Sequence, residues 1–122
     1  MRMTGTVENF RALISVPPRR AGPPDIALEF VIDTGFVGFL TLPVAAVQAL
    51  GLPYKYDTPA NIADDSVVYF PVYGATIVWK GVERNVPVLA MGKRPLLGMA
   101  LLDGNKLVSE CREGGKVHIE DL

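Results

Sequence analysis

Hydrophobic and polar residues alternate over much of this chain, and prolines and glycines divide it into short segments. Apolar side chains recur at every second position in residues 6–16, which predicts a half-buried strand. The segment 17–24 contains four prolines, which lack the N–H donors of a central strand, so a surface loop is expected there. A second strand, 26–33, follows. The N-terminal part of the chain is therefore predicted to be β structure.

A short helix and a set of hairpins are predicted next. Pro43 suits the first turn of a helix whose apolar residues recur three apart up to Leu50, and Gly51 is its expected end. Residues 53–62 and the β-forming run Val67–Trp79 predict a hairpin, with Pro71 implying an edge or a bulge. A further turn and a strand at 82–91 follow from the same alternation.

The C-terminal part predicts a brief helix, Met99–Leu102, that ends near residue 104, and two last strands at 106–111 and 116–120. The whole pattern is that of a mostly β fold with one or two short helices. A length of 122 residues favours one domain, residues 1–122.

Composition narrows the classes of function. The formal net charge is -1, and acidic and basic residues are interspersed, so neither a nucleic acid nor an anionic membrane is an expected partner. Cys111 is the only cysteine, which excludes an internal disulfide and suits a reducing compartment. Neither a signal-peptide pattern nor an apolar run long enough to span a bilayer is found. A cytoplasmic protein is expected.

One carboxylate stands out. An apolar run from Leu28 to Ile32 leads directly into Asp33 at the expected end of a buried strand. Burying an unpaired carboxylate is costly, and perturbed acids concentrate at active sites, although structural hydrogen-bond networks produce them too. Asp33 is therefore the leading candidate for a catalytic residue.

Other reactive side chains lack partners at useful spacing. Asp64 and Asp65 are adjacent, but neighbours point apart in an extended or turn backbone, so a role in the turn is favoured over a metal site. His118 and Cys111 have no nucleophile or base partner in the sequence, which argues against Cys/His catalysis. No metal and no cofactor is expected.

In combination, three segments resemble the retropepsin-like aspartic proteases, specifically their small single-domain prokaryotic type. They are the apolar run into Asp33-Thr34-Gly35, the Leu-Thr-Leu-Pro sequence at 40–43, and Leu96-Leu97-Gly98 before a short helix. The resemblance covers residues 26–119. It implies an acid-protease fold, a closed barrel-like half of a pepsin-type enzyme that works as a homodimer on a peptide or protein substrate.

The resemblance also implies a role for each site residue. Asp33 of two subunits would meet across a two-fold axis and share a proton, and together they would activate a water for peptide hydrolysis. The remaining loop residues would support this catalytic loop: Thr34, Gly35, Leu96, Leu97 and Gly98.

Substrate binding is expected from a flap and from one unusual residue. The turn Ala63, Asp64, Asp65 and Ser66 corresponds to the flap that closes over a bound peptide. Phe36 stands directly after Asp-Thr-Gly, where retroviral members commonly have a small residue. Its ring could narrow the adjoining pockets or turn into the core.

Two other classes of function remain as alternatives. The fold could serve as a non-catalytic dimeric peptide-binding module, because fold does not determine function; retention of the complete Asp-Thr-Gly argues against it. A phosphoryl-transfer enzyme would require further acids and a phosphate-binding loop, and the sequence has no Gly-x-x-x-x-Gly-Lys motif. The sequence therefore favours an aspartic endopeptidase.

Overall fold

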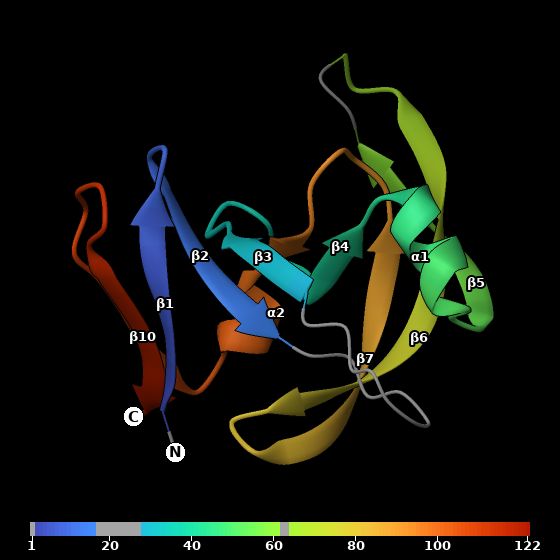
Figure 1. The fold of residues 1–122 in the computed structure, drawn as a ribbon. Helices are drawn as coiled ribbons and strands as arrows, with labels where there is room; N and C mark the ends of the chain where they lie inside the picture. The colour runs from blue at the N-terminus through green and yellow to red at the C-terminus, as the bar shows by residue number, and fades with distance from the viewer. Residues whose placement is uncertain (1, 17–27, 62–63) are drawn as a thin grey trace.

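A computed structural model describes residues 2–16, 28–61 and 64–122 (Figure 1). The described chain is mostly β structure with two short helices. In order, the elements are β1 (Met3–Glu8), β2 (Arg11–Val16), β3 (Leu28–Ile32), β4 (Leu40–Leu42), α1 (Val44–Leu50), β5 (Tyr54–Asn61), β6 (Val67–Trp79), β7 (Val82–Ala90), β8 (Leu96–Leu97), α2 (Met99–Leu102), β9 (Asn105–Ser109) and β10 (Lys116–Asp121).

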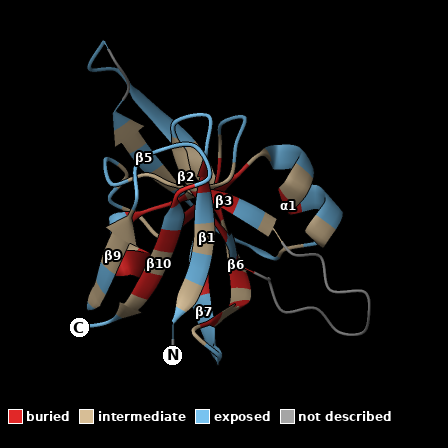
Figure 2. Ribbon diagram, turned by 60° about the vertical axis from the view of Figure 1, so that its left-hand side comes forward, coloured by how far each residue is buried: buried red, intermediate tan, exposed pale blue. Residues whose placement is uncertain are grey.

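The strands form one curled sheet in the order β5-β6-β7-β4-β8-β3-β2-β1-β10-β9. The sheet bends enough for β2 to contact β6, which gives a barrel-like body. Its inner face is apolar, and Figure 2 shows buried positions recurring along β6 and β10. The largest fully buried side chains come from elements far apart in sequence, six from strands and Leu101 from α2: Phe30, Ile14, Leu40, Ile77, Leu97, Leu101 and Ile119. The core therefore joins both ends of the sheet.

Strand β8 lies between β3 and β4. Its pairing with both strands positions the loop that joins them. Ile32 pairs with Leu97 in a parallel ladder, while Leu40 pairs with Leu97 in an antiparallel one. The hydroxyl of Thr41, which is buried, accepts a hydrogen bond from the backbone N–H of Leu96 at 3.1 Å. Because a buried hydroxyl without a partner would be costly, this bond ties β4 to β8.

The single strand predicted for residues 6–16 is wrong. The chain reverses at Asn9 and Phe10, which both have positive φ (51° and 64°), and forms the hairpin of β1 and β2 with Glu8 opposite Arg11. The reversal shifts the apolar phase from odd positions in β1, such as Val7, to even positions in β2, such as Ile14 and Val16. The two turn residues include no glycine, so the strongest sequence signal of a hairpin turn is absent. Phe10 was expected on the apolar face and is instead fully exposed, with a relative accessibility of 105%.

Most of the other elements agree with the pattern, but β4 and β8 were not predicted as strands. Helix α1 ends at Gly51, which adopts a left-handed φ of 63°. Backbone N–H groups at this end donate to the carbonyls of Val47 and Gln48. The β6–β7 turn is formed by Lys80 and Gly81, with φ of 49° and 82°. Pro71 pairs with β5 before the β6–β7 ladder begins at Val72, so that stretch of β6 has one partner strand. The proline-rich loop predicted at 17–24 and the start of the strand predicted at 26–33 lie outside the described residues.

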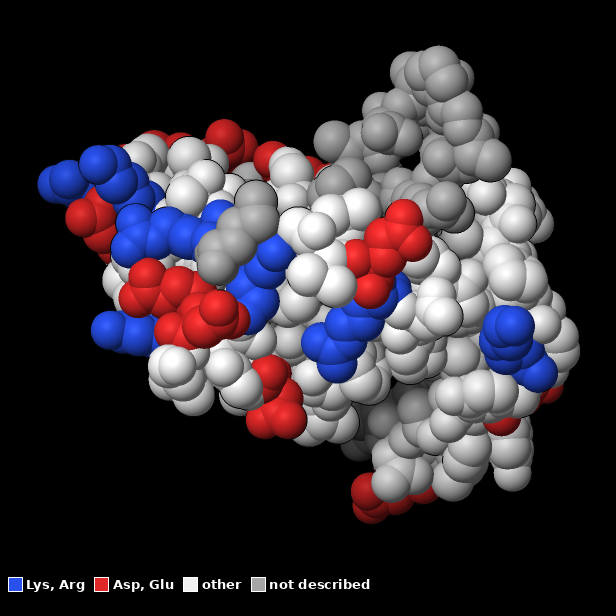
Figure 3. All heavy atoms as spheres, turned by 90° about the horizontal axis from the view of Figure 1, so that it is seen from below, with Lys and Arg blue, Asp and Glu red and all other residues white. Residues whose placement is uncertain are grey.

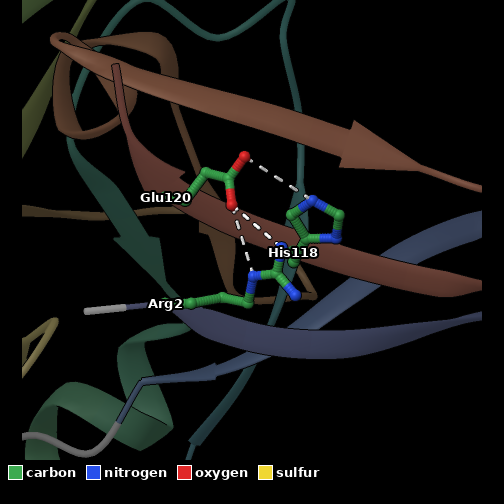
Figure 4. Close-up of polar contacts among 3 residues, drawn as sticks. All are labelled: Arg2, His118 and Glu120. Atoms are coloured by element: carbon green, nitrogen blue, oxygen red, sulfur yellow. Dashed lines mark hydrogen bonds and ion pairs between the residues drawn. The ribbon is translucent and has the colours of Figure 1, made fainter.

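The two ends of the chain are joined within the fold. Strand β1 lies between β10 and β2, and β10 lies between β9 and β1. Arg2 donates from Nε and a terminal nitrogen to Glu120 Oε2 at 3.3 and 3.0 Å (Figure 4). His118 Nε2 lies 3.9 Å from the other oxygen of Glu120, on the partly exposed face opposite the buried Val117 and Ile119. This polar cluster covers the outer face of the terminal strands.

Charges of both signs are interspersed on the surface. The face drawn in Figure 3 carries acidic and basic side chains next to one another. Within the ranges that the structure describes, neither helix is long and apolar enough to cross a membrane.

Glu120 gives a pH-dependent contribution to stability. The hydrogen bond from Arg2 is the main cause that lowers the pKa of Glu120. A carboxylate with a lowered pKa in the folded state stabilises the fold above its ordinary pKa, and this contribution disappears as the pH falls through the folded value. We expect Glu120→Gln to lower the melting temperature slightly at neutral pH and to have no effect below the folded pKa. Melting curves recorded between neutral and strongly acidic pH measure this.

Glu8→Gln is the matched control, because Glu8 is an exposed residue of β1. A deficit in Glu120→Gln that stays constant down to strongly acidic pH would contradict the assignment.

Candidate functional site

Asp33 directly follows β3 and is held by its own loop. Its backbone N–H donates to Leu97 O at 2.9 Å, and its carbonyl accepts from Phe36 N at 3.1 Å. The Gly35 N–H donates to Asp33 Oδ1 at 2.9 Å. A carboxylate that accepts a backbone hydrogen bond has a fixed orientation. The end of β3 and the following turn therefore together orient the Asp33 side chain.

The carboxylate lies at the surface of the protomer. The sequence predicted a buried acid, but Asp33 is partly exposed, and Thr34 and Gly35 beside it are exposed. The difference arises because β3 ends at the rim of the sheet, so the apolar run before Asp33 is covered while the residues after it are not. Asp33 can therefore meet a substrate or another protein molecule directly.

Gly35 leaves room for the carboxylate. A Cβ at this position would lie 3.2 Å from Asp33 Oδ1, closer than an ordinary van der Waals contact. The absence of a side chain thus permits the short hydrogen bond between the Gly35 N–H and Asp33. The structure brings Thr34 and Gly35 next to the acid.

Residues 97–100 hold the loop from beneath through backbone hydrogen bonds. Gly98 N donates to Phe39 O at 2.9 Å, Met99 N to Phe36 O at 2.8 Å, and Ala100 N to Gly38 O at 3.1 Å. A Cβ on Gly98 would lie 2.3 Å from Gly38 O and 2.6 Å from Phe36 O. Only glycine permits this approach. The Leu-Leu-Gly segment and the Asp-Thr-Gly segment are thus packed together, although they are far apart in sequence.

Phe36 lines a small cavity next to the loop. Its ring lies over Gly38 and Gly98, since a Cβ on either glycine would come within 2.5 Å of a ring carbon. The cavity has a volume of about 160 Å³ and also includes Leu40, Thr58 and Leu89. Of the two positions predicted for the ring, the structure shows a half-buried ring that narrows a pocket.

The sequence did not reveal the other residues of this cavity. Tyr56 and Thr58 come from β5, and Val72, Pro87 and Leu89 come from β6 and β7. The alternation of β5 does place Tyr56 and Thr58 on one face, but their position beside Phe36 depends on how the sheet curls.

The predicted flap is a hairpin that projects from the body. Val67, Val68 and Tyr69 are all exposed. Because consecutive strand residues point to opposite faces, both faces of this part of β6 are uncovered. The β5–β6 hairpin extends beyond the sheet at the upper edge of Figure 1.

The two acidic residues in the turn of this hairpin, Asp64 and Asp65, contribute to the conformation of the turn. Asp64 Oδ1 accepts from the Ser66 hydroxyl at 2.5 Å and from Ser66 N at 3.0 Å, and these bonds lower the pKa of Asp64. Asp65 has a φ of 61°, which suits a tight turn. Ala63 lies outside the described residues. The role of Asp64 in the turn agrees with the prediction.

Two larger hollows do not include Asp33. One of about 300 Å³ is lined by Arg11, Leu13, Val31, Arg94 and Pro95, on the β2 side of Asp33. The other, of about 630 Å³, lies at the end of α1. Among residues 2–16, 28–61 and 64–122, no three His, Cys, Asp or Glu side chains come together as possible metal ligands.

A comparison with solved structures identifies the fold. The chain is similar to the crystal structure of a retropepsin-like aspartic protease from Rickettsia conorii, with a TM-score of 0.64 over 97% of this chain and 90% of that chain, at 15% sequence identity. No family model and no curated protein sequence matches the chain. The chain therefore has the retropepsin-like fold, as the sequence predicted: one mostly β domain with two short helices.

Gly98 provides a direct test of how the loop is held. We expect Gly98→Ala to lower the free energy of unfolding by at least about 2 kcal/mol, because the new methyl group would displace the backbone of residues 36–38. Urea denaturation followed by circular dichroism measures this change.

Gly35→Ala is the matched control, since its Cβ would crowd only the Asp33 side chain. It should unfold near the wild-type midpoint. A Gly98→Ala protein as stable as the wild type would show that the close backbone contact is not required.

Proposed function

We propose that the protein is an aspartic endopeptidase whose active site is completed by a second copy of the chain. The observation that carries this proposal is the position of Asp33. Its carboxylate is oriented by Gly35, lies on an exposed loop, and occurs in a chain of retropepsin-like fold that contains one Asp-Thr-Gly. The solved relative is described as an aspartic protease.

The need for a second copy follows from acid–base chemistry. Hydrolysis of a peptide bond requires a base that activates water and an acid that polarises the carbonyl group, and a single carboxyl group cannot be both at once. Two carboxylates close together cannot both be ionised, so they share one proton. Asp33 of two protomers would provide both forms.

In the proposed reaction, the ionised Asp33 takes a proton from water as the water oxygen attacks the carbonyl carbon. The protonated Asp33 of the second protomer gives its proton to the carbonyl oxygen, which produces a tetrahedral diol. Collapse of this diol breaks the C–N bond: the first Asp33 gives the proton that it took from water to the leaving nitrogen, and a diol hydroxyl gives its proton to Asp33 of the second protomer as the carbonyl group re-forms. Both carboxyl groups return to the starting protonation state, and no covalent enzyme intermediate forms.

The surroundings of Asp33 suit a peptide. The cavity beside Phe36 is lined largely by apolar side chains and has room for one aliphatic side chain of a substrate. In this proposal the projecting β5–β6 hairpin would close over an extended chain and exclude water from the reaction. We therefore propose Phe36, Thr58 and Leu89 as residues that contact substrate.

Asp33→Asn tests the catalytic role directly, because it preserves the shape of the side chain and removes the ionisable group. We expect the variant to lose at least about a thousandfold in kcat/KM on a peptide library while its fold is retained. The wild-type rate should show acid and alkaline limbs in its pH profile.

Asp103→Asn, at an exposed position after α2, is the matched control and should keep wild-type activity. Cleavage by Asp33→Asn at the wild-type rate would contradict the proposal. A wild-type protein that is dimeric and binds peptides but cuts none between acidic and neutral pH would instead favour a non-catalytic peptide-binding module.

A further inference from the structure

The hollow of about 630 Å³ at the end of α1 has the size of a site for a small organic molecule, since ligand sites commonly measure about 300 to 1,000 Å³. We call it the α1 hollow. Its described lining comes from the end of α1, from the connection to β5 and from strands β5, β6 and β7, which Figure 1 shows side by side. Asp33 is not among the lining residues, so the α1 hollow is separate from the proposed active site.

Much of the lining is apolar. The side chains of Val72, Ala75 and Val86 line the α1 hollow and are almost fully buried, with 4%, 9% and 3% relative accessibility. Tyr56 and Tyr73 line it as well, and aromatic side chains offer a large apolar surface to a ligand. Covering such side chains with an apolar molecule removes their surface from water, which is favourable. The lining therefore suits a ligand with an aliphatic or aromatic body.

The α1 hollow carries one positive charge. Of the described residues that line it, only Lys55 is charged. Within the described ranges, the Lys55 ammonium group forms neither an ion pair nor a hydrogen bond. The nearest acid along the chain, Asp57, accepts a hydrogen bond from the Tyr54 hydroxyl at 3.1 Å and does not line the hollow. The charge of Lys55 is therefore available to an anionic ligand.

A β-bulge sets the direction of Lys55. The β5–β6 ladder pairs Tyr54 with Tyr73 and Tyr56 with Val72, so Lys55 is an extra residue that has no partner in β6. An extra residue disturbs the regular alternation of a strand, and bulges commonly redirect a side chain in this way. The position of Lys55 in the lining thus results from a defined irregularity of β5.

Gly74 makes room for the side chain of Lys55. A Cβ at Gly74 would lie 2.8 Å from Lys55 Cε and 3.7 Å from Lys55 Cγ. Glycine weakens the interior of a strand and often marks a close approach of another group. The φ of Gly74 is not among the positive values, so its backbone conformation does not require glycine. The missing side chain instead lets the Lys55 stem lie across β6 within the α1 hollow.

Asn85 adds a second hydrogen-bond donor. Its Oδ1 accepts a hydrogen bond from the Thr76 hydroxyl at 2.6 Å, and both residues line the α1 hollow. With its oxygen engaged in this way, the Asn85 side chain has its two amide N–H groups left to donate. Among the described residues, no side chain accepts from them. An ammonium group and an amide N–H group both recognise oxygen acceptors.

We propose that the α1 hollow binds a small organic anion that has one carboxylate or sulfonate group on an apolar body. The anionic group pairs with the ammonium group of Lys55, the body covers Val72 and Val86, and the Asn85 amide donates to an oxygen of the ligand. This inference is independent of the proposed function, because it requires neither Asp33 nor a second copy of the chain.

The dye 8-anilinonaphthalene-1-sulfonate is a suitable probe, because it has one sulfonate group on an aromatic body and its fluorescence increases when it leaves water. We expect the wild-type protein to bind it with a dissociation constant on the order of 10 to 100 μM, as is typical of a ligand of this size. A fluorescence titration measures the constant. A wild-type protein that does not bind the dye at concentrations of about 1 mM would overturn the proposal.

Lys55→Met removes the charge and keeps the length of the side chain. It should raise the dissociation constant of the dye at least about tenfold, the effect of losing a charge-assisted hydrogen bond. Lys116→Met is the matched control, because Lys116 is an exposed residue of β10 that does not line the hollow. Its dissociation constant should stay within about twofold of the wild-type value. A Lys55→Met protein that binds the dye as tightly as the wild type would overturn the proposal.

Gly74→Ala tests the position of the charge separately from its presence. The new methyl group would displace the end of the Lys55 side chain while leaving its charge intact. We expect a rise of about threefold or more in the dissociation constant of the dye, with a melting temperature close to that of the wild type, because a flexible side chain can move aside. Unchanged binding by this variant would contradict the role given to Gly74.

Backbone amide NMR spectra locate the bound dye. Shifts on titration should concentrate at residues 50–56, 72–76 and 85–87 and should be lost in Lys55→Met. The exposed apolar residues Val67, Val68 and Tyr69 of the β5–β6 hairpin offer a competing surface for an aromatic dye. Shifts confined to that hairpin would show that the dye binds there instead, and would overturn the proposal.

Discussion

The structure of the site depends on one close contact between backbones. Gly98 lies directly against the carbonyls of Phe36 and Gly38, where any side chain would collide with them. This approach is possible because β8 is inserted between β3 and β4, parallel to the first and antiparallel to the second. Three hydrogen bonds from residues 98–100 then fix the loop that follows Asp33. The position of one carboxylate is thus determined by two glycine-containing segments far apart in sequence.

The loop that follows Asp33 is held on its inner side and exposed on its outer side. Leu97 and the core cover its inner side, while Thr34, Gly35 and Val37 face outward. A carboxyl group that works as one member of an acid–base pair has to be rigid and also accessible to its counterpart.

The local sequence pattern predicts most of the helices and strands. It does not predict features that depend on contacts between distant parts of the chain. Pro43 and Gly51 delimit α1, and the Lys80-Gly81 turn follows from its glycine, so these could be predicted. The turn at Asn9 and Phe10 is harder to predict, because it lacks the glycine typical of two-residue turns and its signal is only a change of apolar phase between Val7 and Ile14. The exposure of Asp33 depends on what covers the end of β3, and the cavity beside Phe36 depends on the curl of the sheet. Neither is encoded within a short window of sequence.

The central claim is that Asp33 acts only beside its own copy. It is tested most directly by titrating a fixed amount of wild-type protein with folded Asp33→Asn protein under conditions of subunit exchange. Mixed dimers contain one ionisable Asp33, so peptide cleavage should fall to about half at equal amounts of the two proteins and continue to fall with excess variant. Cleavage that stays constant throughout the titration, while mixed dimers are shown to form, would contradict the account.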